Sequence, residues 1–199
     1  MTRIFSDRDF RSAASGYFGH MWELYAYWAF VPFILVLYRD RHPGSAMEVP
    51  LLSFLIIGTG GIACVLGGYL SMRWGEKRTA SLALGISGLC CLFSPLFFKV
   101  GSQQIFIGIM FIWGMAVIAD SPLFSTLVAR NAPEASRGTA LTIVNCIGFS
   151  ITILSIQLLN LMKDAMDPYV IFILLSLGPL YGILALDGFP FFRTRPAPR

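Results

Sequence analysis

Six long apolar stretches follow one another along this chain of 199 residues, separated by short hydrophilic segments. Each stretch is about 20 residues or longer, the length that an α-helix needs to cross the ~30 Å hydrocarbon core of a bilayer. A soluble domain of this size would not need six such runs. The sequence therefore predicts an all-α membrane protein with six transmembrane helices. These helices are expected at residues 15–38, 49–72, 79–98, 102–129, 138–162 and 168–187.

Positive charges are distributed unevenly over the hydrophilic segments. The first, third, fifth and seventh segments hold 11 of the 15 Lys and Arg residues, and the even-numbered segments hold the other four. Because basic loops stay on the cytoplasmic side, this bias predicts that both termini are cytoplasmic. We expect a linker-like N-terminus at residues 1–14, a transmembrane domain at residues 15–188 and a cytoplasmic tail at residues 189–199.

The composition supports this class and argues against others. Hydrophobic residues make up 56% of the chain and charged residues 13%, whereas soluble domains carry roughly 25% charged residues. The net charge of +4 lies in short loops, where membrane orientation and contact with anionic lipid headgroups explain it without nucleic acid. All four cysteines lie within predicted spans, where we expect them to fill helix contacts. We expect no metal, no cofactor and no enzymatic activity, since neither metal-ligand spacing nor a nucleophile motif is present.

Three ionisable residues fall inside the predicted spans: His20, Glu23 and Asp120. Such a group in hydrocarbon costs at least ~2.5–3.5 kcal/mol, so each one requires an explanation. At a rise of 1.5 Å per residue, Glu23 and Asp120 lie ~12 Å and ~13 Å from the cytoplasmic ends of their helices. We interpret all three as candidates for transport or proton coupling. In the structural alternative, Glu23 and His20 bond each other or a neighbouring helix, and Asp120 lies near a hydrated cytoplasmic vestibule.

Helical spacing adds further candidates. His20, Glu23, Tyr27 and Phe30 follow an i, i+3, i+7, i+10 pattern and form one stripe, so Tyr27 and Phe30 are candidates for lining a cavity. Two neutral polar residues in the fifth predicted span are also cavity-lining candidates, although helix–helix hydrogen bonding explains them equally well. They are Asn145 and Gln157. Pro122 cannot donate to the carbonyl four residues before it, so we expect a kink or hinge beside Asp120.

Two loop motifs and one helix carry a resemblance to a known family. Residues 68–78, GYLSMRWGEKR, resemble the G-x-L-x-D-R-x-G-R-R/K signature between the second and third helices of each half of the major facilitator superfamily. Residues 133–140, PEASRGTA, resemble the P-x-x-x-R-G-x-A entry to the fifth helix of a half. Residues 16–28, GYFGHMWELYAYW, resemble the start of the seventh helix in a group of bacterial members. Met72 and Glu76 depart from the signature, which usually has an acidic and a basic residue there.

The resemblance implies a C-terminal six-helix half, a 3+3 inverted repeat, of a twelve-helix transporter in a bacterial inner (plasma) membrane. It assigns a gating role to the two loops, with Gly68 permitting close helix approach, Arg73 meeting acidic or carbonyl partners, and Gly75 allowing a tight turn. The full set of gate residues is Gly68, Arg73, Gly75, Lys77, Arg78, Arg137 and Gly138. In this fold the first and fourth helices of a half line the central cavity, and here they carry Glu23 and Asp120.

The implied function is alternating-access transport of a small solute, as a symporter or antiporter coupled to protons. Its expected partners are the lipid bilayer, the solute, and either a missing N-terminal half or a second copy in a parallel homodimer. The two halves of such transporters are related by an axis along the membrane normal, which a parallel dimer reproduces. Two alternatives remain open at this point: a non-transporting membrane interaction or accessory protein, and an inactive truncated transporter fragment.

Overall fold

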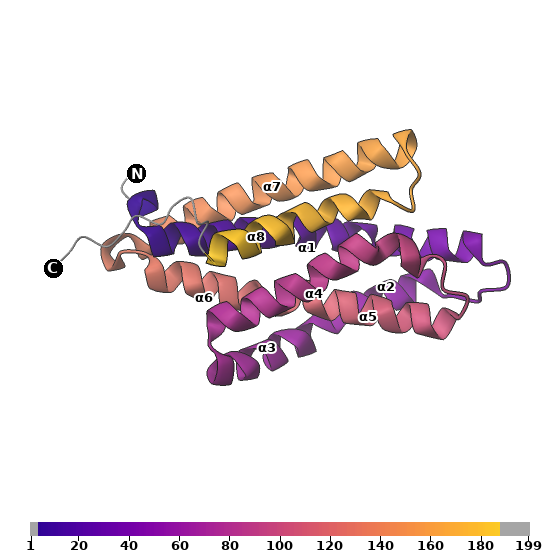
Figure 1. Cartoon of the computed structure of the whole chain (residues 1–199), viewed down its shortest axis with the longest axis horizontal. Coiled ribbons are helices and arrows are strands. Elements are labelled where there is room, and N and C mark those ends of the chain that lie inside the picture. The colour runs from indigo at the N-terminus through magenta and orange to yellow at the C-terminus, as the bar shows by residue number, and fades with distance from the viewer. Residues whose placement is uncertain (1–3, 188–199) are drawn as a thin grey trace.

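The computed structural model describes residues 4–187, and every regular element in this range is helical (Figure 1). The long elements are α1 (Arg8–Arg41), α2 (Val49–Gly58), α3 (Gly60–Trp74), α4 (Glu76–Phe97), α5 (Gln103–Ala119), α6 (Ser121–Asn131), α7 (Arg137–Ala165) and α8 (Leu177–Asp187). Three 3₁₀ segments complete the list: η1 (Ile4–Ser6), η2 (Glu134–Ser136) and η3 (Ile171–Ser176). The expected tail at residues 189–199 lies outside the described residues.

Five helical segments are long and apolar enough to cross a membrane. They are Arg8–Arg41, Val49–Trp74, Glu76–Phe97, Gln103–Asn131 and Glu134–Ala165. A sixth apolar segment, Ile171–Leu186, is shorter. Its first part is the 3₁₀ segment η3, which rises about 2.0 Å per residue instead of 1.5 Å, so that the segment reaches nearly the ~30 Å of a hydrocarbon core. The predicted all-α, six-helix architecture is confirmed.

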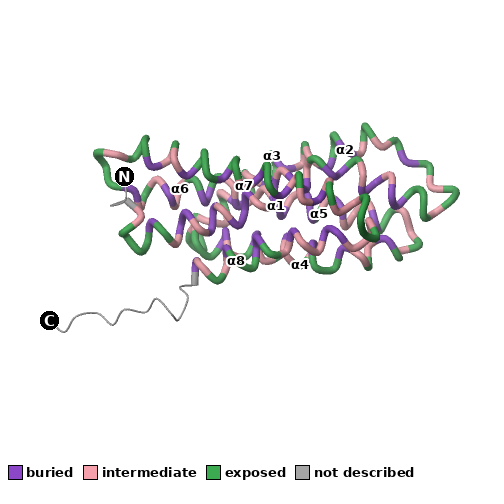
Figure 2. Tube along the Cα trace, turned by 90° about the horizontal axis from the view of Figure 1, so that it is seen from above, coloured by how far each residue is buried: buried purple, intermediate pink, exposed green. Residues whose placement is uncertain are grey.

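Helix α1 is the central element of the bundle. In its most apolar 18-residue window 56% of the residues are buried, against 22–39% in the other four long segments, and the buried positions in Figure 2 lie toward the interior. The helix begins where the Asp7 carboxylate accepts a hydrogen bond from the Phe10 amide at 2.9 Å, an N-cap that satisfies a free donor. Gly19 meets Gly178 where α1 crosses α8. Because glycine has no side chain, α1 and α8 can approach each other closely at this crossing.

Two of the six spans are each divided into two helices. The second span is interrupted at Thr59, between α2 and α3, where Thr59 Oγ1 donates to the Ile56 carbonyl at 2.8 Å. The sequence did not lead us to expect this break, although Gly58 and Gly60 flank it and glycine weakens a helix by roughly 1 kcal/mol. The fourth span is interrupted at Asp120, between α5 and α6, with Pro122 in the first turn of α6.

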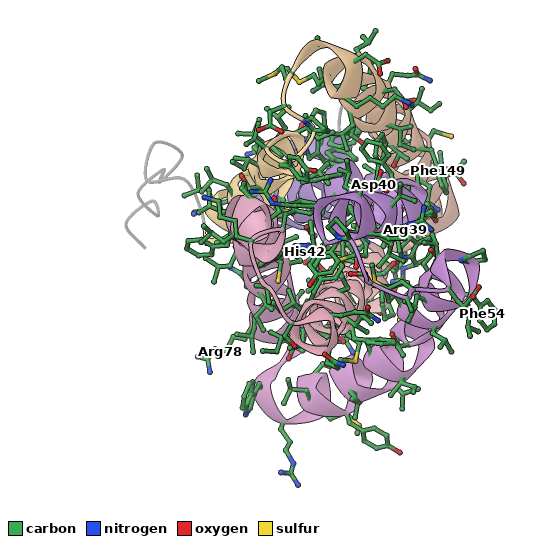
Figure 3. All side chains as sticks on the ribbon, turned by 90° about the vertical axis from the view of Figure 1, so that its right-hand side faces the viewer. Arg39, Asp40, His42, Phe54, Arg78 and Phe149 are labelled. Atoms are coloured by element: carbon green, nitrogen blue, oxygen red, sulfur yellow. The ribbon has the colours of Figure 1, made fainter. Side chains whose placement is uncertain are left out.

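One end of the bundle is rich in basic residues. The start of α1 and the end of α8 lie together, since Ser12 Oγ donates to the Ala185 carbonyl at 2.8 Å (left in Figure 1). We call this the basic end, because it also holds the α3–α4 turn and the α6–α7 connection with their Arg and Lys residues. Between the two ends many large apolar side chains are exposed on the outer surface, as a lipid environment requires. In Figure 3, Phe54 of α2 and Phe149 of α7 project on one side and Arg78 on the other.

Candidate functional site

Glu23 is fully buried in the middle of the bundle and its carboxylate contacts three donors. Its Oε2 accepts from Ser87 Oγ at 2.8 Å, and its Oε1 accepts from Cys91 Sγ and from Trp113 Nε1, both at 3.1 Å. These donors come from α4 and α5, so three helices meet at one carboxylate. We call this group of four residues the Glu23 cluster. No Lys, Arg or His within residues 4–187 forms an ion pair with Glu23.

His20 and Asp120 form a second buried polar group one helical turn away on α1. His20 Nδ1 lies 2.9 Å from Asp120 Oδ1, and each side chain is 1% exposed. Asp120 joins α5 to α6, so the contact connects α1 to the point where the fourth span is interrupted. Apart from this contact, neither oxygen of Asp120 has a hydrogen-bond partner among the described residues, and neither does the Nε2 of His20. We call these two residues the His20–Asp120 pair.

These contacts decide between the structural alternatives that the sequence left open. Glu23 and His20 do not bond each other but bond neighbouring helices, the other form of the structural alternative. Glu23 contacts α4 and α5, whereas His20 contacts the junction of α5 and α6. Asp120 is 0% exposed and packs beside the His20 ring, so it does not lie in a hydrated vestibule. The predicted stripe on α1 is nevertheless real, since His20, Glu23, Tyr27 and Phe30 are all buried.

Tyr27 and Phe30 do not line an open cavity, which corrects the expectation from their spacing. Tyr27 is 0% exposed, its ring lies 4.6 Å from the Trp113 ring, and its hydroxyl donates to the Met110 carbonyl at 3.0 Å. Phe30 packs against Phe172 with ring centroids 6.0 Å apart. Aromatic side chains at the centre of a bundle contribute most when they fill it completely. Their role in this arrangement is packing.

Asn145 and Gln157 occupy the outer side of α7 and are exposed. Neither side chain has a hydrogen-bond partner among the described residues, so they do not join the helices of this bundle to one another. Their exposure differs from that of Thr152 on the same helix, which is buried and donates to the Met21 carbonyl at 2.9 Å. An amide without a partner is unfavourable in hydrocarbon. Water or polar groups would therefore suit these two amides better than lipid chains.

The α3–α4 turn confirms one glycine assignment and corrects the other. Gly75 has φ +84°, a left-handed conformation that favours glycine and allows the tight turn. Gly68, expected to permit close approach, has nothing within 4 Å of the position where a Cβ would lie. The close approach is made by Gly67, where a Cβ would stand 2.7 Å from the Ala119 carbonyl oxygen. Adjacent residues of an α-helix point in directions about 100° apart around its axis. The sequence motif does not show which of the two glycines faces the neighbouring helix.

The charges of the two loops are paired differently from the expectation. Arg73 is exposed and has no hydrogen bond or ion pair with any described residue. The ion pair in this region joins Glu76 Oε1 to Arg130 Nη1 at 2.9 Å, and so links the start of α4 to the end of α6. Glu76 stands where the family signature has a basic residue, and its partner lies in the other triplet of helices. The other gate residues at the same end are all exposed: Lys77, Arg78, Arg137 and Gly138.

The sequence did not identify Ser87, Cys91 and Trp113 as parts of a site. Cys91 was expected to be filler, yet its thiol donates to Glu23. One signal was present, because Ser87 and Cys91 are four residues apart and thus lie on one face of a helix. The sequence does not show how α4 is rotated about its own axis, and this rotation determines whether the face with Ser87 and Cys91 meets Glu23. Within residues 4–187, no three His, Cys, Asp or Glu side chains are grouped closely enough to hold a metal ion.

Comparison with known proteins gives one match. The family model described as Major Facilitator Superfamily matches residues 2–156, which is most of the chain. No curated protein and no solved structure gave a match. The match covers α1 to α6 and much of α7, and so includes the Glu23 cluster, the His20–Asp120 pair and both loops. The chain belongs to the major facilitator superfamily, a family of membrane transporters.

Proposed function

We propose that this protein is a secondary active transporter of a small solute, working by alternating access and coupled to protons at Glu23 and the His20–Asp120 pair. The observation that best supports this is the position of the Ser87 hydroxyl. Ser87 Oγ lies 2.8 Å from Glu23 Oε2 and 3.1 Å from the Leu84 carbonyl oxygen. The hydroxyl therefore has two acceptors within reach and one proton to donate.

This geometry suits a carboxyl group that gains and loses a proton. When Glu23 is ionised, it accepts hydrogen bonds from Ser87, Cys91 and Trp113. When Glu23 is protonated, its own O–H can donate to Ser87 Oγ, while the Ser87 hydroxyl turns to Leu84. Both forms keep their hydrogen bonds. Since an ionised carboxylate without a cation costs several kcal/mol when buried, a proton is the simplest counter-charge.

The His20–Asp120 pair connects protonation to the shape of the bundle. Its carboxylate belongs to the residue between α5 and α6, where the helical hydrogen-bond ladder is already interrupted. Adding or removing a proton changes the attraction between His20 on α1 and this junction. A change at the junction alters the angle between α5 and α6, in keeping with the hinge role proposed for Pro122. Such bending is one way for a helical bundle to open alternately to the two sides of the membrane.

A second six-helix half completes the proposed transporter. The exposed amides of Asn145 and Gln157 support this, because they need water or polar partners beyond the described bundle. That half is either a separate chain or a second copy related by an axis along the membrane normal. The uneven distribution of Arg and Lys favours a parallel arrangement, with both termini in the cytoplasm of a bacterium whose inner membrane holds the protein.

The test begins with the mass of the protein in mild detergent. About twice the chain mass of 22.0 kDa indicates that a second copy supplies the other half, and 22.0 kDa indicates that a separate half must be added before flux is measured. The complete assembly is then reconstituted into vesicles containing a pH-sensitive dye and tested with a panel of small organic solutes. We expect at least one solute gradient to drive proton movement.

Glu23→Gln and Asp120→Asn separate coupling from folding. We expect both variants to continue solute exchange across the membrane but to lose proton-driven accumulation. Asp40→Asn is the matched control, because its carboxylate is exposed at the opposite end of α1. Accumulation by Glu23→Gln at the wild-type level would show that Glu23 has only a structural role. Absence of any solute-driven flux in the complete assembly would favour an accessory protein or an inactive fragment.

A further inference from the structure

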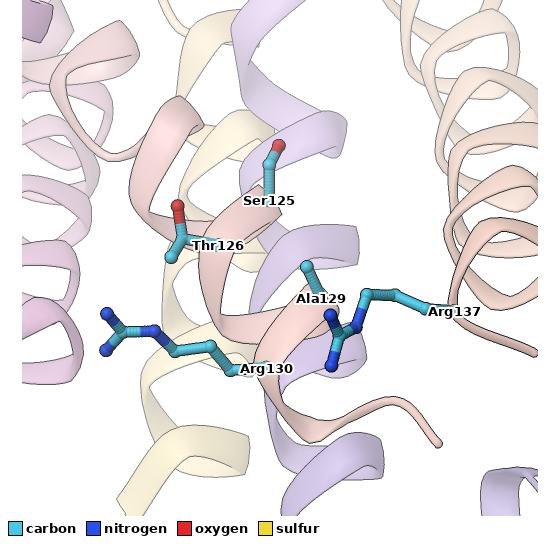
Figure 4. A pocket seen from close by; sticks show the side chains of 5 residues that line it. All are labelled: Ser125, Thr126, Ala129, Arg130 and Arg137. Carbon is cyan, nitrogen blue, oxygen red and sulfur yellow. The ribbon is translucent and has the colours of Figure 1, made fainter. Parts of the chain in front are cut away.

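A pocket of ≈ 410 Å³ opens at the basic end, between α6 and α7. Four of its lining residues belong to α6 and one belongs to α7: Ser125, Thr126, Ala129, Arg130 and Arg137. In Figure 4, Arg137 reaches from α7 across to Ala129, while Arg130 extends from the other side of α6. The pocket includes no residue of the Glu23 cluster or of the His20–Asp120 pair, and the proposed coupling mechanism does not use it.

The pocket carries one positive charge more than its surroundings neutralise. Arg130 is already paired with Glu76, at 2.9 Å. Arg137 has no hydrogen bond or ion pair with any residue in the described part of the chain. No acidic residue lines the pocket. The complementary ligand is therefore an anion with a single negative charge, and a guanidinium is well suited to the oxygens of a phosphate group.

The hydroxyl groups of the pocket define a second property of the ligand. Ser125 Oγ donates to the Ser121 carbonyl at 3.2 Å, and Thr126 Oγ1 donates to the Pro122 carbonyl at 2.8 Å. Each hydroxyl has used its only proton, so its oxygen is left as an acceptor. The pocket thus combines an unpaired cation with two acceptors. A ligand with a phosphodiester and hydroxyl groups of its own satisfies both.

We propose that this pocket binds the headgroup of an anionic glycerophospholipid of the phosphatidylglycerol type. Its phosphodiester carries one negative charge and contacts Arg137, and its headgroup hydroxyls donate to Ser125 and Thr126. A free phosphate at pH 7 is a mixture of the singly and doubly charged anion, so on average it carries more negative charge than the pocket balances. The position also fits, because basic pockets between transmembrane helices at a cytoplasmic surface face lipid headgroups.

The proposal is tested by titrating the detergent-purified protein with phosphatidylglycerol and counting bound lipid by native mass spectrometry. We expect one lipid to bind more tightly than the rest, and Arg137→Gln to weaken that binding about fivefold, the effect of one arginine near a lipid surface. Phosphatidylcholine, which has the phosphodiester but neither the net charge nor headgroup hydroxyls, should bind more weakly. Inorganic phosphate should not displace phosphatidylglycerol.

Arg8→Gln is the matched control. Arg8 is the first residue of α1 as Arg137 is the first residue of α7, it is exposed at the same end, and it lies outside the pocket. Its removal should leave the tight site intact, and unchanged thermal unfolding of both variants should show that they are folded. Equal lipid affinity in Arg137→Gln and wild type would overturn the proposal. Displacement by inorganic phosphate would overturn the lipid assignment and leave a soluble phosphate as the ligand.

Discussion

Gly67 and Gly68 are adjacent residues with opposite surroundings. The position of a Cβ on Gly67 is 2.7 Å from a backbone oxygen of Ala119, which cannot rotate away, whereas a Cβ on Gly68 would meet nothing within 4 Å. Cys64 Sγ, one turn earlier on α3, contacts the Ile118 carbonyl at 3.6 Å. The close approach at Gly67 therefore holds α3 against the last turn of α5, next to Asp120.

This difference gives a matched pair of variants. Gly67→Ala should lower the thermal unfolding midpoint in detergent, because overpacking against a fixed backbone typically costs about 1–3 kcal/mol. Gly68→Ala should keep the wild-type midpoint or raise it slightly, since alanine is favoured over glycine within a helix by roughly 0.5–1 kcal/mol. Equal midpoints in the two variants would show that α3 and α5 are farther apart than described.

At the scale of helices, two prolines show that a proline alone does not determine a break. Pro32 lies within α1, which remains continuous from Arg8 to Arg41. Pro122 lies two residues after Asp120, at which the helix is interrupted. At the interruption, the side chain of Asp120 contacts His20 of another helix at 2.9 Å. A proline permits a break by removing one amide donor, and a tertiary contact keeps the break at one position.

Pro122→Ala returns an amide donor to the junction of α5 and α6. We expect slower hydrogen exchange in residues 118–126, by about fivefold for one hydrogen bond worth ~1 kcal/mol, together with slower transport. Pro32→Ala is the control, because α1 is already continuous and should show no such local change. The measurement is hydrogen–deuterium exchange followed by mass spectrometry. Faster or unchanged exchange at residues 118–126 would contradict a hinge at this junction.

At the scale of the molecule, the six crossings and the charge bias together predict the orientation in the membrane. An even number of spans places the start of α1 and the end of α8 at one end, where Ser12 bonds to Ala185. The same end holds the Arg and Lys residues of the α3–α4 turn and of the α6–α7 connection. Basic loops remain on the cytoplasmic side during insertion. The basic end is therefore expected to face the cytoplasm.

Reporter fusions test this orientation in cells. Alkaline phosphatase, which is active only outside the cytoplasm, should be active when fused at Gly44, between α1 and α2, and inactive when fused at Gly75, between α3 and α4. A green fluorescent protein fusion, active only inside, should give the opposite pattern at the two positions. Activity of the phosphatase at Gly75 would reverse the orientation and move the pocket at Arg137 to the outer surface.

The number of spans and their expected orientation were predictable because they depend only on the hydrophobicity and charge of successive segments. The number of spans follows from runs of apolar residues, and the expected orientation follows from counts of Arg and Lys. The loop motifs resemble those of the family to which the chain belongs. Glu23 and Asp120 were recognised as candidates because an ionisable group is costly in hydrocarbon wherever it faces. These properties need only the order of the residues.

The contacts of those residues depend on the tertiary structure alone. Glu23 meets Ser87, Cys91 and Trp113, and His20 meets Asp120, because of how far each helix is rotated about its axis and shifted along it. A rotation of 100° separates one residue from the next, and no local pattern specifies it. The rotation of each helix about its axis and its shift along that axis depend on the packing of all the helices together. The sequence by itself thus determined a six-span member of its family with buried acids, and only packing decided which donors surround each acid.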